Sequence, residues 1–561
     1  MVRSPKTLLG KGTKVHVGGV AREPMEIVAA ILHFLRNDAK AQHPGREFEH
    51  AIVTIPVNMM GRSRRELRDA ALSAGLHIVQ FVHEPLAALY GFMRSQADFR
   101  KQMDALEGQI ALVFDWGGGT VDLTLCKFTR GTLVQIRNKG DDNVGGDRFD
   151  ELLLRKLKDR HAVKHRIETW PGEMPGAEAR LLWDCESAKI ELSAKPSYPI
   201  YVANFLRAEG VERNLDLTLE RKDLEDWTKD LVDAGFANID TLLESAGVRE
   251  SSISLCLATG GMVNMPAIRN RLDERFGRVR APVILNGDRI IAEGAAWIAH
   301  DTIRVRLAKP FELRHADNTY VTILPENTVL PIENGFISET FGMYCVDPRD
   351  GYAKFEFARP RWPDRKQAAD PRDPYETLTL RVDPTASPLF ERLDVNLQVD
   401  GDLIVTIAAQ SQGRGDQQSV EIHNLEFGLG MPGENAPDSS GREASADASD
   451  LGPRRAMDQL KVSPRVLGEV RLRSNVTKRQ TAWDLVPGEI IENYKPGYFL
   501  VGNNPSHRQI DERLYYRPCA LCGRAWFESQ WNGCDECARL GTGPSASEAM
   551  ARRDAIPDMP T

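Results

Sequence analysis

The first 300 residues alternate between short apolar runs and longer segments with apolar residues at helical spacing. Apolar runs of strand length occur at Ile110–Phe114 and Val121–Phe128, and amphipathic segments such as 23–40 separate other runs of this kind. This alternation predicts an α/β domain. The pattern predicts helices over 23–40, 63–74, 84–94, 147–160, 178–193, 218–247, 266–276 and 292–300, and further strands over 51–56, 78–82, 133–137, 254–257 and 283–285.

The pattern changes after about residue 310. Residues 311–338 and 393–409 alternate apolar and polar positions, which predicts an antiparallel β-domain. Residues 350–388 are rich in Pro, Asp and Arg and are expected to form long loops, and 432–455 has the composition of a disordered linker. The expected divisions are an α/β domain over 1–300, a β-rich domain over 301–430, a linker over 431–460, a small module over 461–545 and a flexible tail over 546–561.

The composition is that of a soluble globular protein. The 561 residues are 42% hydrophobic and 27% charged, with a net charge of −8, and this acidic balance argues against nucleic acid or an anionic membrane as the partner of the whole chain. No apolar run is long enough to span a bilayer, and the N-terminus lacks a stretch of signal-peptide length. We therefore expect a cytoplasmic protein.

A glycine-rich turn lies between the two apolar runs at 110–128. The segment Phe114–Asp122 reads FDWGGGTVD, and its glycines Gly117, Gly118 and Gly119 allow bare N–H groups to converge on an anion. Thr120 adds a hydroxyl group, and carboxylates beside a phosphate site, here Asp115 and Asp122, commonly organise Mg²⁺ through its waters. The sequence favours a strand–turn–strand phosphate loop, with a plain tight hairpin as the alternative.

Two further glycine pairs follow predicted strands. Gly145-Gly146 stands just before a helix beginning near Asp147, and Gly260-Gly261 follows the strand at 254–257. Ligands of open α/β sheets bind at strand ends, so the three turns together favour a phosphate-containing ligand. On the predicted helix at 178–193, Glu186, Lys189 and Ser193 share one face; this face could hold a polar ligand, although an exposed Glu–Lys pair is the commoner explanation.

The eight cysteines fall into two groups. Four are scattered through apolar segments and are expected to be core residues: Cys126, Cys185, Cys256 and Cys345. The other four form two C-x-x-C pairs, Cys519/Cys522 and Cys534/Cys537, with eleven residues between the pairs. This spacing predicts a structural Zn²⁺ site in a small zinc-ribbon-like module, because four thiolates complete a tetrahedral shell. Disulfides or redox use of these cysteines are the alternative, which is disfavoured in a cytoplasmic protein.

Six segments together carry a family resemblance. They read AIVTIPVNMMGRSRRELRDAALSAGL (51–76), VHEPLAALYGF (82–92), LVFDWGGGTVDLTL (112–125), NVGGDRFDELLL (143–154), CESAKIELS (185–193) and ATGGMVNMPAI (258–268). In this order and at these separations, the chain to about residue 300 resembles the nucleotide-binding domain of the heat-shock protein 70 family, the DnaK-type chaperones. The resemblance implies a two-lobed, actin-like ATPase domain that binds ATP or ADP with Mg²⁺.

The resemblance also implies roles for individual residues. Lys6 matches the lysine that positions the attacking water, and Glu84 matches the acidic residue that senses nucleotide between the lobes. Pro56 and Arg64 match a pair that relays nucleotide state to the next domain. Catalysis would further use Asp115, Thr120 and Asp122. The nucleotide would contact Gly117, Gly118, Gly119, Thr120, Gly145, Gly146, Asp147, Glu186, Lys189, Ser193, Gly260, Gly261 and Asp288.

The β-rich stretch resembles the substrate-binding β-sandwich of the same family, through residues 309–335 and 393–410. This implies unfolded or client polypeptides as partners, together with co-chaperones. The partner of the zinc module is not indicated.

The chain departs from the family pattern at several points. No segment matching the first phosphate loop precedes Lys6, so an incomplete N-terminal lobe is expected, and Ile190, Met262 and Asn264 replace family residues of the adenosine side. Two hypotheses follow. The first is a divergent ATP-hydrolysing chaperone, and the second is a non-hydrolysing scaffold that recruits partners through its β-domain and zinc module. A small-molecule kinase is disfavoured because no sugar-site pattern is present.

Overall fold

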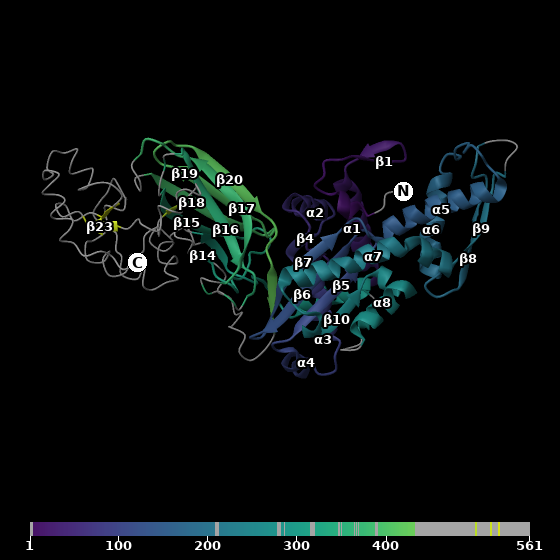
Figure 1. The fold of residues 1–561 in the computed structure, drawn as a ribbon, viewed down its shortest axis with the longest axis horizontal. Coiled ribbons are helices and arrows are strands. Elements are labelled where there is room, and N and C mark those ends of the chain that lie inside the picture. The colour runs from purple at the N-terminus through teal and green to yellow at the C-terminus, as the bar shows by residue number, and fades with distance from the viewer. Residues whose placement is uncertain are drawn as a thin grey trace. The chain divides into compact units, whose positions relative to one another are not determined.

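A computed structural model describes residues 4–431, apart from short gaps, and three short strands nearer the C-terminus (Figure 1). The gaps are 208–211, 278–281, 285–286, 315–319, 346–347, 349, 364, 366, 368–369 and 387–390. The chain divides into two units: unit 1 is Met1–Arg306 with Glu426–Pro437, and unit 2 is Leu307–Leu425 with Asp438–Thr561. The expected disordered linker and the four C-terminal cysteines lie outside the described residues.

Unit 1 is built on a mixed sheet. Among the described residues, seven strands form it in the order β11-β10-β5-β6-β7-β21-β12. The strands are β5 (Ile110–Trp116), β6 (Val121–Thr129), β7 (Thr132–Asp141), β10 (Ile253–Thr259), β11 (Val283–Ile284), β12 (Val305–Leu307) and β21 (Phe427–Gly430). β5, β6 and β7 form an antiparallel meander, and β10 runs parallel to β5. β5 and β6 are buried along nearly their whole length, which explains their continuous apolar runs.

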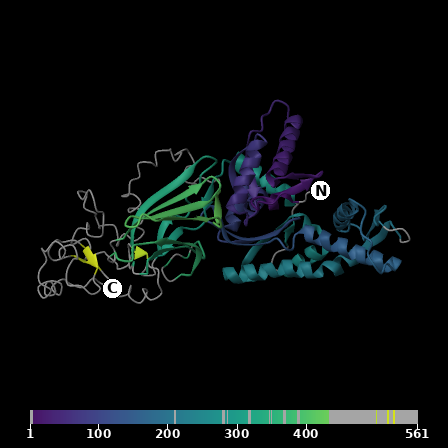
Figure 2. The ribbon, with the colours of Figure 1, turned by 90° about the horizontal axis from the view of Figure 1, so that it is seen from above.

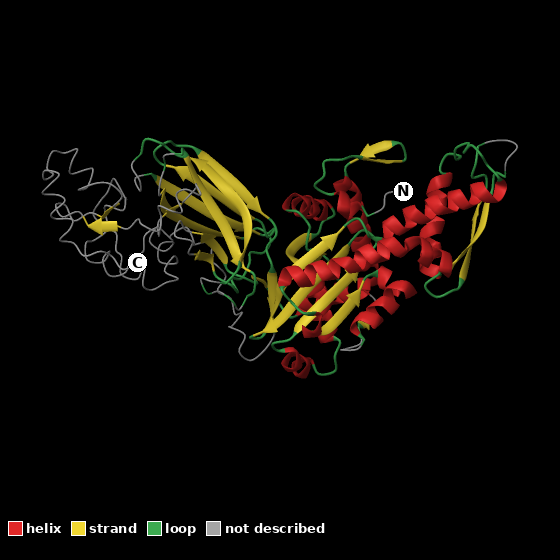
Figure 3. Ribbon diagram, viewed as in Figure 1, coloured by secondary structure: helices red, strands yellow, loops and turns green. Residues whose placement is uncertain are grey.

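Helices cover this sheet (Figures 2 and 3). The described helices are α1 (Pro24–Gln42), α2 (Gly61–Ser73), α3 (Glu84–Arg94), α4 (Phe99–Leu106), α5 (Gly146–His165), α6 (Ala177–Glu191), α7 (Arg221–Ala246), α8 (Pro266–Phe276) and α9 (Gly287–His300), with 3₁₀ turns η1 (Pro5–Leu8), η2 (Glu250–Ser252) and η3 (Gly261–Asn264). α7 crosses the sheet over β6 and β7. The α/β class predicted from the alternating pattern is confirmed.

A second, parallel pair of strands lies near the N-terminus of unit 1. It consists of β3 (His50–Ile55) and β4 (His77–His83), and β4 leads directly into α3. α3 packs closely on α9 because both helices carry a glycine at the crossing. A Cβ atom on Gly294 would lie 1.9 Å from the Ala87 carbonyl oxygen, and one on Gly91 would lie 2.6 Å from the Ile290 carbonyl oxygen. The small-residue run in α9 therefore serves helix packing.

Short strand pairs in unit 1 were not predicted from the pattern. They are β1 (Val15–Val17) with β2 (Val20–Arg22), and β8 (Ser197–Val202) with β9 (Leu215–Glu220). β9 overlaps the start of the predicted helix at 218–247, which actually begins at Arg221. The sequence LDLTLE alternates buried and exposed positions, so the period of two prevails over helical propensity there.

The described part of unit 2 contains two larger sheets, of order β14-β13-β16-β17 and β20-β19-β18-β15-β22. All of their strand pairs except β15–β22 are antiparallel, so the antiparallel β-domain prediction is confirmed for this part of the chain. The strands are β13 (Phe311–Arg314), β14 (Tyr320–Leu324), β15 (Phe336–Cys345), β16 (Tyr352–Pro360), β17 (Arg372–Arg381), β18 (Arg392–Asp400), β19 (Val405–Ser411), β20 (Gln417–Ile422) and β22 (Leu500–Val501). A separate pair is β23 (Tyr516–Pro518) with β24 (Ala525–Phe527).

The expectation of long loops over 350–388 is wrong, because this stretch contains β16 and β17. The charged residues that suggested loops are paired inside the sheet. Arg372 Nε donates to Glu312 Oε2 at 2.7 Å, and both side chains are almost fully buried. A buried arginine is tolerated when its donors are satisfied in this way, and the partner lies 60 residues away in the sequence.

Candidate functional site

Two of the three predicted glycine turns are joined by backbone hydrogen bonds. Gly146 N donates to the Gly117 carbonyl at 3.1 Å, and Asp147 N donates to the Gly118 carbonyl at 2.7 Å. The β5–β6 turn is itself closed by Gly117 N donating to the Thr120 carbonyl at 2.9 Å. The turn after β5 (Gly117–Thr120) and the start of α5 (Gly145–Asp147) therefore form one continuous backbone surface at the strand ends, the glycine rim.

Glycine is required where these turns touch. A Cβ atom on Gly145 would lie 2.3 Å from the Gly119 carbonyl carbon, and one on Gly260, which has φ +87°, would lie 2.3 Å from the Trp116 carbonyl oxygen. A Cβ atom on Gly118 would meet nothing closer than 4.0 Å, and one on Gly261 would meet nothing within 4 Å. These last two glycines face open space, as expected of a backbone surface that receives a ligand.

Gly145→Ala is expected to destabilise the protein by about 1–3 kcal/mol, because the new methyl group collides with backbone that cannot rotate away. It should also weaken Mg·ATP binding by at least about tenfold through displacement of the Gly117–Thr120 turn. Thermal unfolding and equilibrium ATP binding measure the two effects. Gly261→Ala is the control for unfolding, since that Cβ has free space; a Gly145→Ala variant that melts like the parent would contradict the close approach.

Acidic side chains gather beside the β5–β6 turn. Asp115 is the penultimate residue of β5 and faces Asp122 of β6 in the strand register, while Glu84 is the first residue of α3. Lys6 of η1 donates from Nζ to Glu84 Oε1 at 2.7 Å, and Thr120 Oγ1 donates to Asp122 Oδ2 at 2.7 Å. The structure thus brings the five residues predicted to be catalytic into one neighbourhood.

Burial perturbs the two aspartates. Burial raises the pKa of Asp115 to about 8, and the nearby charges of Glu84 and Asp122 add to the rise. Burial also raises the pKa of Asp122 to about 7, against the lowering effects of the Thr120 hydrogen bond and of Lys6. Several carboxyl groups held out of water near one lysine favour an added cation. These residues fit a Mg²⁺–phosphate ligand: Asp115 and Asp122 would hold the ion through water, and the ion would supply positive charge beside the carboxylates.

The raised pKa of Asp115 predicts a pH-dependent effect of Asp115→Asn on stability. The folded pKa of about 8 lies above the ordinary value of 3.8, so protonation of Asp115 stabilises the folded state fully below pH 3.8. This stabilisation is lost as the pH rises towards about 8. The melting temperature of Asp115→Asn minus that of the parent should therefore increase from pH 5 to pH 8 in nucleotide-free protein.

The control for this pH series is Asp142→Asn, because Asp142 is an exposed aspartate. It should show no such trend between pH 5 and pH 8. If the difference in melting temperature between Asp115→Asn and the parent stayed constant from pH 5 to pH 8, the assignment of Asp115 as a buried titrating group would be contradicted.

The N-terminal residues pack against the rim. Ser4 Oγ donates to Asp147 Oδ2 at 2.8 Å, and a Cβ on Gly119 would lie 3.3 Å from Thr7 Cγ2. η1 is thereby held next to both glycine turns, and this position brings Lys6 to Glu84. The sequence motif around Lys6 alone could not reveal Ser4, whose hydroxyl partner lies 143 residues away.

Lys189 lies under the rim. Its Nζ is 2.8 Å from Asp150 Oδ1 and donates to the Gly146 carbonyl at 2.9 Å. The interpretation of Lys189 as part of an exposed Glu–Lys pair is therefore wrong, because the side chain is buried and pairs with α5. Ser193 Oγ donates to the Lys189 carbonyl at 3.3 Å, and Glu186 is half-buried on the same helix. Their adenosine-binding roles stay predictions.

The predicted relay residues lie between β3 and α3. Pro56 directly follows β3, and Arg64 is fully buried in α2, where Nε donates to the Met59 carbonyl at 2.9 Å. The sequence analysis missed Asn58, whose side chain packs against the backbone of Gly140, the strand partner of Asp122. The packing is close, because a Cβ atom on Gly140 would lie only 1.8 Å from Asn58 Nδ2. For Asp288, the structure describes only its position in α9 (Gly287–His300).

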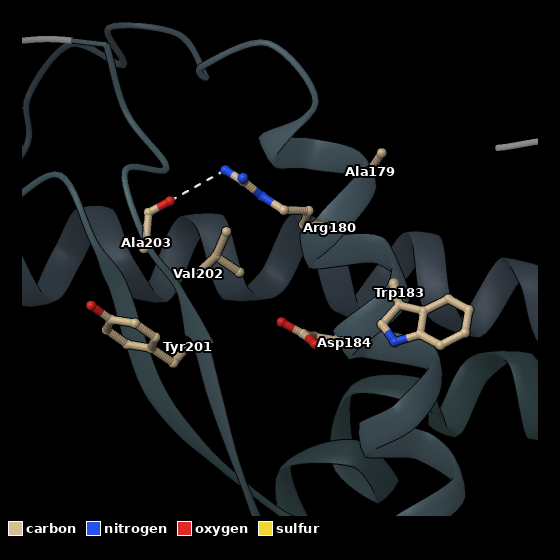
Figure 4. A pocket seen from close by; sticks show the side chains of 7 residues that line it. All are labelled: Ala179, Arg180, Trp183, Asp184, Tyr201, Val202 and Ala203. Atoms are coloured by element: carbon tan, nitrogen blue, oxygen red, sulfur yellow. Dashed lines mark hydrogen bonds between the residues drawn. The ribbon is translucent and has the colours of Figure 1, made fainter. Parts of the chain in front are cut away.

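A surface pocket of about 550 Å³ lies elsewhere in unit 1, between α6 and β8 (Figure 4). It is lined by Ala179, Arg180, Trp183, Asp184, Tyr201, Val202 and Ala203. The dashed line marks Arg180 Nη2 donating to the Ala203 carbonyl at 3.2 Å. None of the predicted site residues lines this pocket, so it is separate from the glycine rim.

The cysteine and metal predictions have mixed outcomes. Cys126, Cys185, Cys256 and Cys345 are buried, which confirms them as core residues. The zinc prediction concerns Cys519, Cys522, Cys534 and Cys537, which lie outside the described residues. Within the described part of the chain, no group of three or more His, Cys, Asp or Glu side chains is placed to hold a metal ion directly, and no described helix has the length and apolar character needed to cross a membrane.

Most of this chain is similar in sequence to known proteins. The profile of the Hsp70 protein family matches residues 7–430. The chaperone protein DnaK of Thermotoga petrophila is 27% identical over 436 residues, covering 75% of this chain and 69% of the relative. The DnaK of Mycoplasmopsis agalactiae shows the same identity and coverage over 432 residues. The dnaK1 protein of Synechocystis is 27% identical over 418 residues, covering 73% of this chain and 57% of the relative. The chain belongs to the Hsp70 family.

Proposed function

We propose that this chain is an ATP-dependent molecular chaperone of divergent type. The observation that carries the proposal is the rim of glycine turns beside Asp115, Asp122 and the Lys6–Glu84 ion pair. Backbone N–H groups without covering side chains suit phosphate oxygens, and buried carboxyl groups with one lysine suit hydrated Mg²⁺. Relatives named as chaperone protein DnaK support the same function.

Different residues would have different roles in this site, as in phosphoryl-transfer sites generally. Gly117–Thr120 would hold the phosphates, and Asp115 and Asp122 would hold Mg²⁺ through water. Lys6 would orient the attacking water, and its ion pair with Glu84 fixes the amine next to the phosphate turn. Gly145–Asp147, with Gly260 and Gly261, would face the sugar and adenine. Mg²⁺, when bound, stabilises the charge that develops on the transferred phosphate.

The β-rich unit 2 would receive an unfolded polypeptide, and the nucleotide would control how tightly the polypeptide is held. The C-terminal cysteines would form a structural zinc site with a partner of its own. Zinc content of the purified full chain, measured with and without the four cysteines replaced by serine, tests that part: loss of one bound zinc per chain is expected.

A non-hydrolysing scaffold is the second candidate, and the packing around Gly146 favours it. Met262 is buried, and a Cβ on Gly146 would lie 2.9 Å from its sulfur and 3.0 Å from Lys189 Nζ. Met262, which replaces a family residue after the glycine pair Gly260-Gly261, therefore lies against Gly146 on the proposed adenosine side. In this alternative, nucleotide would bind weakly or as a structural ligand, and partners would be recruited without turnover.

The release of an unfolded peptide tests the proposal against this alternative. A fluorescent unfolded peptide is bound to the full chain, and its dissociation rate is measured by anisotropy with and without Mg·ATP. An ATP-dependent chaperone should release the peptide at least about tenfold faster with Mg·ATP, and Asp115→Asn should abolish the acceleration. A peptide dissociation rate that does not change with Mg·ATP would contradict the proposal and support the non-hydrolysing scaffold.

A further inference from the structure

The pocket between α6 and β8 contains side chains that have no role in the proposed ATP site. Its volume of about 550 Å³ lies in the range that is usual for small-molecule sites, about 300–1,000 Å³. One wall is α6, which supplies Arg180, Trp183 and Asp184, and the other is the end of β8, which supplies Tyr201 (Figure 4). The pocket is therefore a candidate ligand site apart from the glycine rim.

Two aromatic side chains of this pocket are largely open to solvent. Trp183 is 55% exposed and Tyr201 is 59% exposed, whereas Trp116 and Phe149 of the same unit are fully buried. Within the part of the chain that the structure describes, neither exposed ring contacts another aromatic ring or a cationic side chain. Large apolar rings left in water have a free-energy cost, and a ligand that packs between them removes this cost.

A carboxylate lies between these two rings. Figure 4 shows Asp184 with Tyr201 on one side and Trp183 on the other, and all three side chains line the pocket. Arg180 stands four residues before Asp184 on α6, a spacing that commonly gives an ion pair. The Arg180 guanidinium instead donates from Nη2 to the Ala203 carbonyl at 3.2 Å. The Asp184 carboxylate is therefore left without a cation among the described residues.

Partial burial makes this carboxylate a stronger site for a positive charge. Asp184 is half-buried, and this burial raises its pKa, with no hydrogen bond or nearby charge contributing to the shift. A cation placed beside the carboxylate would compensate for the water that burial removes. The Arg180 charge does not fill this role, because its guanidinium points toward the Ala203 end of the pocket (Figure 4).

The three side chains together suit an organic cation. A guanidinium or alkylammonium group is attracted to the face of an aromatic ring, and most strongly to tryptophan. A carboxylate within reach adds a charge-assisted hydrogen bond, which is roughly twice as strong as a neutral one. A bare Mg²⁺ or Ca²⁺ ion suits the pocket less well, because these ions need several oxygen ligands and the pocket offers one carboxylate.

We propose that this pocket binds a small organic cation with a guanidinium or alkylammonium group, which lies between Trp183 and Tyr201 and pairs with Asp184. The volume of the pocket suits a whole small molecule, so the ligand is a free compound. An arginine side chain of a polypeptide carries the same group, and the experiment below compares the two sources. The site does not depend on the proposed ATP site, because none of the residues expected to bind nucleotide lines it.

Fluorine NMR of the full chain labelled with 5-fluorotryptophan tests this assignment. The Trp183 signal is identified by its absence in Trp183→Phe. Butylguanidinium should shift this signal saturably, with a Kd of about 1 mM or below, and its neutral isostere butylurea should bind at least about tenfold more weakly. Asp184→Asn should weaken butylguanidinium binding at least about tenfold, and Tyr201→Ala should weaken it about fivefold. Asp226→Asn, at an exposed position of α7, should leave the binding unchanged.

The outcomes decide both the chemistry of the ligand and its source. Equal binding of butylurea and butylguanidinium, or an Asp184→Asn variant with the parent affinity, would overturn a cation site. A Trp183 signal that neither compound shifts would overturn it as well. Binding of the peptide Gly-Arg-Gly at least about tenfold more tightly than butylguanidinium would overturn the assignment to a free small molecule. The titrations contain no nucleotide, so failure here leaves the proposed function intact, and a chain that does not bind ATP leaves this test unaffected.

Discussion

Lys189→Met is expected to lower the free energy of unfolding by about 3–5 kcal/mol, because it removes one partner of a buried ion pair. The Lys189 and Asp150 side chains are only 10% and 1% exposed, and their charged atoms lie 2.8 Å apart. Methionine fills similar space but supplies no charge and no hydrogen bond to the Gly146 carbonyl. Chemical denaturation monitored by circular dichroism measures the effect.

A matched double variant separates charge from packing. Lys189→Met combined with Asp150→Leu removes both charges and should recover much of the lost stability, since replacing a buried ion pair by apolar residues is often nearly neutral. Exchanging the exposed Lys195 for methionine should destabilise the protein much less than Lys189→Met does, because its ion pair with Glu191 is at the surface. If Lys189→Met were no more destabilising than the Lys195 variant, the pair would not hold α6 to α5.

Lys6→Ala is expected to slow single-turnover ATP hydrolysis by about 10²–10³-fold, the usual effect of removing one preorganised donor from a charged transition state. The amine lies 2.7 Å from Glu84 Oε1, beside the Gly117–Thr120 turn and the carboxyl groups of Asp115 and Asp122. ATP affinity should change much less, because most of the proposed contacts come from the backbone rim. Rapid-quench kinetics with excess enzyme measures the chemical step.

The control for Lys6→Ala is Lys11→Ala, an exposed lysine close in sequence, which should hydrolyse ATP at the parent rate. Equal single-turnover rates for Lys6→Ala and the parent would exclude Lys6 from catalysis. Loss of both binding and turnover would instead indicate that η1 is needed to hold the rim through Ser4 and Thr7.

The sequence predicted the local features of the site well. The three glycine turns lie at the ends of β5, β7 and β10, because continuous apolar runs mark buried strands and glycines mark the tight turns that follow them. The clustering of Asp115, Asp122 and Glu84 also agrees with the motifs, since each residue lies at the end of a strand or the start of a helix, and these ends meet at one edge of the fold.

The predictions that were wrong or missing concern residues whose partners are distant in the sequence. Lys189 looked like a surface residue because its partner, Asp150, belongs to another helix. Residues 352–360 and 372–381 looked like loops because their arginines and acids pair only after the sheet forms. β21 is a four-residue segment with two glycines whose sheet partner lies almost 300 residues earlier, and no local pattern distinguishes it from a turn.

The most direct test of the central claim is a calorimetric titration of the nucleotide-free full chain with ATP, with and without Mg²⁺. The structure predicts one binding site per chain, tighter with Mg²⁺ and weakened at least about tenfold by Gly145→Ala. Absence of binding heat, together with an unchanged melting temperature at millimolar Mg·ATP, would contradict a nucleotide site at the glycine rim.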